Sequence, residues 1–136
     1  MTAKFDWDNA EQTVGRYDLT GNWTWDELDE VMDESWAKIA KRDVVIDSIL
    51  IFENRSLPPN AMPHLRKLAT ERPANTGILV AIGAGIIQRS VVQVFTRAYS
   101  STLRREVPIM FADSLDEARQ ILAQKRVERG ELPQTP

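Results

Sequence analysis

An α/β fold is predicted by three features of the sequence. A near-continuous apolar run at residues 78–82 is followed by glycines at positions 83 and 85 and then by an amphipathic segment. An apolar run without polar alternation is typical of a strand that is covered on both faces. Helix-like and strand-like segments alternate along the rest of the chain, behind two strand-like segments at its start. The order β-β-α-β-α-β-α-β-α predicts an N-terminal hairpin and then a mostly parallel sheet.

The composition is that of one globular domain. The chain has 136 residues, of which 43% are hydrophobic and 27% are charged, and both fractions are ordinary for such domains. We expect residues 1–127 to form a single domain. Residues 128–136 are polar and rich in proline, so we expect them to form a flexible C-terminal tail.

Several classes of protein are disfavoured by the composition. A net charge of −3 offers no basic excess for binding nucleic acid. No apolar run approaches the roughly 20 residues that a membrane span needs. The chain has no cysteine, which excludes disulfides and thiolate metal sites. The first residues lack the apolar core of a signal peptide, so we expect a cytoplasmic protein of bacterial type.

The first half of the chain carries clear strand and helix signals. Residues 5–8 alternate apolar with acidic, residues 9–12 suit a turn and residues 13–20 suit a second strand, which together predict a hairpin. Thr24 and Glu27 form a capping box that begins the first helix. The side chains that we expect this helix to bury are Trp25, Leu28, Met32, Trp36 and Ile39. A β-branched strand is predicted at residues 44–52.

The second half repeats the alternation. A helix is predicted from an Asn60 N-cap to about Arg72, and a wider one over residues 86–100. The wider helix has two apolar stripes, which consist of Ile87, Val91, Val94 and Ala98 and of Val92, Phe95 and Tyr99. A last strand is predicted at residues 106–112. Ser114 is expected to cap a last helix that buries Leu115, Ala118, Ile121 and Leu122.

The segments at residues 21–28 and 109–119, which open the first and last helices, carry a family resemblance. Together with the element order they resemble the STAS superfamily and, more narrowly, its SpoIIAA-like branch of small stand-alone bacterial domains. The resemblance extends over roughly residues 17–122. It implies a sheet of four or five strands with helices wound around it. It also implies a non-enzymatic role, because members bind regulatory partners and some carry small ligands.

The resemblance also points to a serine. Anti-sigma-factor antagonists of this superfamily carry a phosphorylatable serine in an Asp-Ser-Ser-Gly-like turn between the third strand and the second helix. Ser56 is the hydroxyl residue at the matching place, within residues 54–60. The aspartate and the glycine of that turn are missing here, which argues against Ser56 as a phosphosite.

A possible ligand rim is predicted where the strands end. Ligands of open α/β sheets lie beyond the carboxyl ends of the strands. The residues that we expect at this edge are Asn54, Arg55, Ser56, Gly83, Gly85, Gln88 and Arg89, with Asp113 and Ser114 beside them. Such a polar and mildly basic rim suits a phosphate or a carboxylate, and it is equally compatible with a solvated loop.

Other motifs favour structural interpretations. Gly83 and Gly85 invite a dinucleotide site, but Gln88 stands where its third glycine belongs, so we interpret them as a tight turn. His64 is the single histidine and is expected to be a surface or packing residue. The acidic side chains on one face of the first helix, Asp26, Asp29, Glu30 and Asp33, fit a solvated face without a metal. No catalytic, cofactor-binding or metal-ligating residue is predicted.

Two functional hypotheses follow. The first is a regulatory protein-interaction domain, with a homodimer or partner interface at Trp7, Trp23, Val92, Phe95 and Tyr99, because exposed aromatic residues are enriched at interfaces. The alternative is a carrier or sensor of a small anionic or lipid-like ligand at the predicted rim. Either protein would be non-enzymatic and would work without a cofactor.

Overall fold

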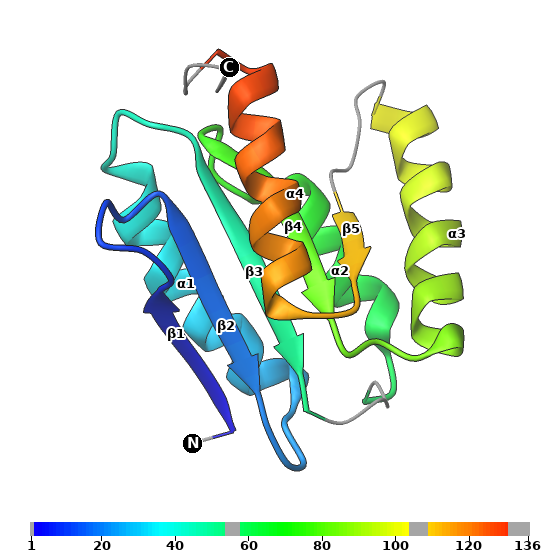
Figure 1. The fold of residues 1–136 in the computed structure, drawn as a ribbon. Helices are drawn as coiled ribbons and strands as arrows, with labels where there is room; N and C mark the ends of the chain where they lie inside the picture. The colour runs from blue at the N-terminus through cyan, green and yellow to red at the C-terminus, as the bar shows by residue number, and fades with distance from the viewer. Residues whose placement is uncertain (1, 54–57, 104–108, 131–136) are drawn as a thin grey trace.

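The computed structural model describes residues 2–53, 58–103 and 109–130, apart from the side chains at positions 87 and 99–103. Within these ranges the chain forms a five-stranded mixed sheet and four helices (Figure 1). The elements in chain order are β1 (Ala3–Trp7), β2 (Val14–Leu19), α1 (Trp25–Ala40), β3 (Ile46–Phe52), α2 (Ala61–Thr70), β4 (Thr76–Ile82), α3 (Ile86–Leu103), β5 (Ile109–Ala112) and α4 (Leu115–Glu128). The predicted α/β class is confirmed.

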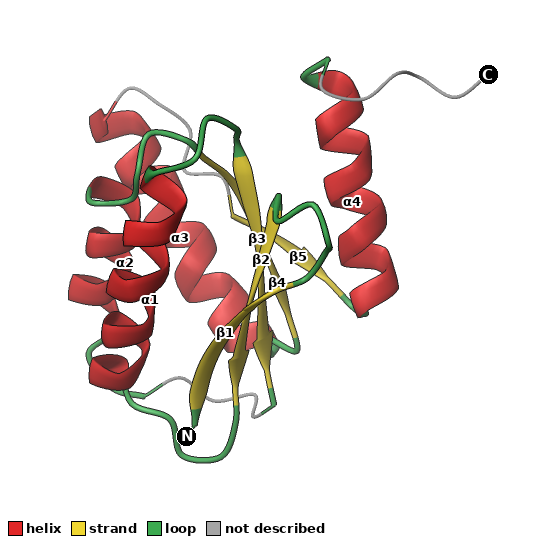
Figure 2. Cartoon of the chain, turned by 90° about the vertical axis from the view of Figure 1, so that its left-hand side faces the viewer, coloured by secondary structure: helices red, strands yellow, loops and turns green. Residues whose placement is uncertain are grey.

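The strands follow one another across the sheet in the order β1-β2-β3-β4-β5. β1 pairs antiparallel with β2, and β2–β3, β3–β4 and β4–β5 pair in parallel. Right-handed crossovers between sequential parallel strands place the connecting helices on one face. Accordingly α1, α2 and α3 cover one face of the sheet and α4 lies on the other (Figure 2).

Local hydrogen bonds explain why the first elements form where they do. The Asn9 side-chain oxygen accepts from the backbone amides of Thr13 and Val14 at 3.0 and 3.1 Å, which closes the turn of the hairpin. The Thr24 hydroxyl accepts from the Glu27 amide at 3.2 Å and begins α1 as predicted. These short-range signals fix the entry of α1 onto the sheet.

Two apolar cores lie on the two faces of the sheet. Alternation along each strand sends successive side chains to opposite faces. The core under α1 contains Ala3, Tyr17, Leu19, Trp23, Trp25, Leu28, Val31, Met32 and Leu50. The core under α4 contains Val14, Ile49, Val80, Ile82, Ala112, Ala118 and Leu122. The buried central strands account for the apolar runs of the sequence.

Two predicted helix boundaries need correction. Asn60 precedes α2 in a left-handed backbone conformation with φ of 67°, and its side chain makes no capping hydrogen bond. The N-cap prediction therefore had the right position but the wrong mechanism. At the other end, α4 extends through Glu128 and Arg129 bonds to Asp47, so the predicted tail at residues 128–136 begins too early. Residues 131–136 lie outside the described ranges.

Helix α3 packs on the rest of the molecule through Phe95 and, beside it, the partly buried Val91 and Val92. Phe95 is fully buried against Leu65 and Ala69 of α2. Val94, from the other predicted stripe, is 65% exposed. None of the described helices, α3 included, is long and apolar enough to cross a membrane.

Tyr17 links the fold to pH. Its hydroxyl lies 2.5 Å from that of Ser35 in the core, and burial raises its pKa from 10.0 to about 12, although the Ser35 hydrogen bond opposes the shift. The unfolded chain therefore loses the tyrosine proton at lower pH than the native one. The stability that the protonated Tyr17 contributes is fully present below pH 10 and is lost as the pH rises toward 12. The loss in the free energy of unfolding is about 2–3 kcal/mol.

We expect Tyr17→Phe to remove this part of the pH dependence. Urea unfolding of the wild type and the variant across alkaline pH measures it. Because only the wild type has the buried phenol, the gap between the two free energies of unfolding should narrow above pH 10. Parallel curves would show that Tyr17 does not titrate on unfolding.

Candidate functional site

An apolar cavity of about 50 Å³ lies between the sheet and the three helices that cover one of its faces, α1, α2 and α3. Its floor is formed by the side chains of three neighbouring strands, Leu50 and Phe52 of β3, Leu79 and Ala81 of β4, and Phe111 of β5. Phe52 is the last residue of β3, and Ala81 and Phe111 are the last but one of theirs. The lining also includes Ile109 at the start of β5, so the cavity extends along the short strand β5 and reaches the carboxyl ends of the parallel strands, where α/β sheets bind ligands.

The cavity wall includes, from each covering helix, a pair of side chains three or four residues apart. The pairs are Leu28 and Met32 of α1, Leu65 and Leu68 of α2, and Gln88 and Val92 of α3. Spacings of three or four residues place both members of each pair on one helical face. The periodicity of the three helices therefore explains how these side chains come to form the wall. Gln88 is the polar side chain that α3 contributes.

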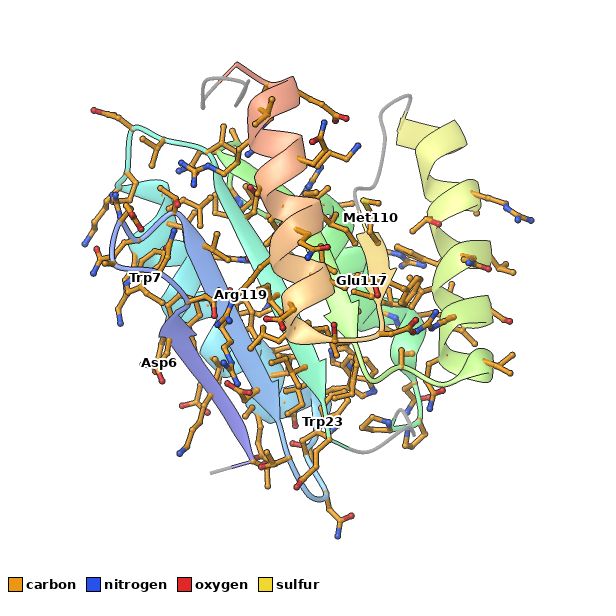
Figure 3. All side chains as sticks on the ribbon, in the orientation of Figure 1. Asp6, Trp7, Trp23, Met110, Glu117 and Arg119 are labelled. Atoms are coloured by element: carbon orange, nitrogen blue, oxygen red, sulfur yellow. The ribbon has the colours of Figure 1, made fainter. Side chains whose placement is uncertain are left out.

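Two tryptophans, Trp23 and Trp25, line the cavity. Trp23 packs edge-on against Trp25 with 4.9 Å between ring centroids, and it also contacts Phe52 at 5.9 Å. Figure 3 shows Trp23 beside the carboxyl ends of β2 and β3. Its exposed fraction is 4%, so the prediction of Trp23 as an interface residue is wrong. The indole nitrogen of Trp25 donates to the Pro58 carbonyl at 3.0 Å, which holds the ring in place.

Beside Gln88, the polar side chains of the cavity lining are an Asp–His pair. His64 Nδ1 lies 2.8 Å from Asp29 Oδ2, and its ring stacks on Trp25 at 4.9 Å between centroids with an interplanar angle of 7°. Both side chains line the cavity. Sequence reasoning missed this pair because Asp29 and His64 are 35 residues apart on different helices.

The predicted ligand rim is only partly assembled. Gln88 lines the cavity, whereas Arg89 is held at the β4–α3 turn by protein groups. There its Nη2 lies 3.2 Å from Asp113 Oδ1, its Nε donates to the Ala84 carbonyl at 3.2 Å, and its guanidinium lies 5.3 Å from the centre of the Phe111 ring. This cation is committed to protein groups.

The other predicted rim residues have structural roles or lie outside the described ranges. Gly83 has φ of 86° in the turn, and the Gly85 carbonyl accepts from the Arg89 amide in the first turn of α3. The Ser114 hydroxyl caps α4 by accepting from the Glu117 amide at 3.1 Å. Asn54, Arg55 and Ser56, with the phosphosite prediction, belong to residues that the structure does not describe.

The four predicted interface residues whose side chains the structure describes do not form one surface. Trp23 and Phe95 are buried in different clusters and Val92 lines the cavity. Trp7 is half-buried on β1, beneath the guanidinium of Arg42 at 5.8 Å, and the side chain of Tyr99 is not described. The prediction is wrong for Phe95 because one stripe of α3 is used to pack on α2.

Two of the four acidic side chains on one face of α1, Asp29 and Asp33, pair with side chains of α2. Asp29 bonds to His64, and Asp33 lies 2.9 Å from the Lys67 ammonium, whose pKa is raised chiefly by this hydrogen bond. In the part of the chain that the structure describes, no group of three His, Asp or Glu side chains is arranged to hold a metal ion. The pairing explains the acidic spacing by helix–helix contact.

A second hollow lies on the sheet half that α4 leaves uncovered. It is an open trough of about 690 Å³ lined by charged side chains of β1 and β2 and by Arg119, which projects from α4 toward these strands (Figure 3). Four of these charged side chains form ion pairs within the trough, Arg119 with Asp8 at 2.9 Å and Arg16 with Asp18 at 3.0 Å. The enclosed apolar cavity is therefore the better candidate site.

The chain was compared with protein-family models, with curated proteins and with solved structures. None of the three comparisons finds a match. The resemblance to STAS domains therefore rests on the sequence segments and the element order alone.

Proposed function

We propose that this chain is a non-enzymatic domain that carries or senses a small apolar ligand in the cavity between the sheet and helices α1, α2 and α3. The observation that carries the proposal is the position of this cavity at the carboxyl ends of three parallel strands. Its nearly continuous apolar lining favours a lipid-like group over the phosphate or carboxylate considered for the rim. A SpoIIAA-like arrangement with a mostly parallel sheet, and a regulatory role of the STAS type, would be consistent with a sensor.

The size of the cavity limits what it can hold. Pockets that enclose a whole drug-sized molecule measure about 300–1,000 Å³, and this one measures about 50 Å³. It has room for a short aliphatic chain. We therefore propose that the apolar end of the ligand is bound there while its other end lies near the polar side chains of the lining.

A cavity-filling variant tests this function. Ala81 is buried in the cavity floor, so Ala81→Val should fill much of the space and keep the fold, with unfolding free energy unchanged or raised by up to about 1 kcal/mol. We expect 1-hexanol to shift the methyl NMR signals of Leu50, Leu68 and Leu79 in the wild type and to bind Ala81→Val at least about tenfold more weakly.

The matched control lies on the same strand. Ile82 faces the α4 core, so Ile82→Val changes packing on the opposite side and should leave hexanol binding unchanged. Equal binding by wild type and Ala81→Val would refute the cavity as the ligand site. Native mass spectrometry of the purified protein adds a direct readout, because a stoichiometric small mass would identify the natural ligand.

A further inference from the structure

The Asp29–His64 pair has features that packing alone does not require. The imidazole is held on two sides, by the Asp29 carboxylate at one ring nitrogen and by the Trp25 indole across its face. Trp25 is itself fixed by its hydrogen bond to Pro58. A histidine whose orientation is set by a carboxylate and a stacked ring presents its second nitrogen in a defined direction.

The hydrogen-bonding capacity of that second nitrogen follows from the first. A carboxylate only accepts hydrogen bonds, so Nδ1 of His64 carries the proton shared with Asp29. Nε2 then accepts when the ring is neutral and donates when the ring is protonated. Among the described residues Nε2 has no hydrogen-bond partner, although His64 lines the cavity.

The charges around His64 select against an anion. Asp29 is in direct contact, and Asp33 lies one turn further along α1, where Lys67 balances it. Asp26 and Glu30 lie on the same helix. Arg89, the cation of the predicted rim that the structure describes, pairs with Asp113. A carboxylate head group placed at Nε2 would therefore lie close to the Asp29 carboxylate, and the two negative charges would repel each other.

We propose that His64 Nε2 binds the hydroxyl group of a neutral, apolar alcohol whose hydrocarbon chain fills the cavity. A hydroxyl both donates and accepts, so it pairs with Nε2 in either protonation state of the ring. This inference rests on the proposed ligand-binding function and names the head group that the site recognises. It replaces the anionic ligand expected from the sequence.

The experiment compares two probes of equal chain length, 1-hexanol and hexanoate, by methyl NMR titration near neutral pH. Wild type should bind hexanol at least about tenfold more tightly than hexanoate. His64→Phe keeps a ring to stack on Trp25 but removes Nε2, so it should weaken hexanol binding by about 2- to 10-fold, the range of one neutral hydrogen bond. Equal affinities for the two probes, or an unchanged hexanol affinity in His64→Phe, would overturn the inference.

A second variant guards against misfolding of the first. Asp29→Asn keeps a hydrogen bond to Nδ1 and removes one negative charge, so it should narrow the preference for hexanol over hexanoate by about fivefold. An unchanged preference would count against the electrostatic argument.

If neither probe binds the wild type, the proposed function fails as well. If hexanol binds and Ala81→Val abolishes binding while His64→Phe does not, the function stands and only the head-group inference fails.

Discussion

Arg129→Met is expected to lower the free energy of unfolding by about 3 kcal/mol. Asp47 is fully buried in β3, and both of its carboxylate oxygens accept from the Arg129 guanidinium, at 3.0 and 2.8 Å. One of them also accepts from the Ile78 amide at 2.9 Å. Removal of the arginine leaves a buried carboxylate with one hydrogen bond and no counter-charge. The partial exposure of Arg129, 29% of its side chain, places the effect at the low end of the range for buried ion pairs.

A double-mutant cycle isolates this ion pair. Asp47→Asn removes the charge and keeps an oxygen for the Ile78 amide, so Arg129→Met should cost about 1–2 kcal/mol less in that background. Arg16→Met is the matched control, because Arg16 and Asp18 are both about one-third exposed, and it should cost less than about 1 kcal/mol. Strictly additive losses for Asp47 and Arg129 in urea unfolding would refute the coupling.

The parts of this fold that the sequence predicts are those determined by neighbouring residues. The capping boxes at Thr24 and Ser114 were predicted because the capping hydroxyl and the amide it satisfies are three residues apart. The hairpin turn at residues 9–12 was also predicted, because it too is determined by residues that are close in sequence. The Asp47–Arg129 pair joins residues 82 positions apart, and no local pattern distinguishes Arg129 from an ordinary tail residue.

The candidate site shows the same division. Of the residues that the sequence placed at the carboxyl edge of the sheet, Gln88 lines the cavity there, and ligand binding at this edge stays a prediction. The edge is less polar and less basic than predicted, because Arg89 pairs with Asp113 and the cavity wall is mostly apolar. Amphipathic periodicity shows that Phe95 faces something apolar, but it does not tell whether the neighbour is α2 or a second protein chain.

Gly83→Ala is the other substitution for which we expect a large loss, about 3 kcal/mol. Gly83 has φ of 86°, which L-residues adopt at a cost of about 1–2 kcal/mol. An added Cβ would also overlap the backbone carbonyl oxygen of Phe52. This oxygen belongs to the end of β3 and cannot move aside as a flexible side chain would, so overpacking adds about 1–3 kcal/mol.

Gly130→Ala separates these two contributions. Gly130 has a similar φ of 77°, but no atom of the described residues lies within 4 Å of an added Cβ. It should therefore lose only the conformational part, about 1 kcal/mol, and the difference between the two variants in urea unfolding measures the overlap with Phe52. Equal losses would show that the β4–α3 turn can shift away from β3.

That turn carries Ala84 and leads to Gln88, and both residues line the cavity. A shift of the turn would therefore enlarge the cavity, and Gly83→Ala should then bind 1-hexanol with altered affinity. A loss confined to Gly83 means instead that a close approach of two backbones holds the cavity wall in place.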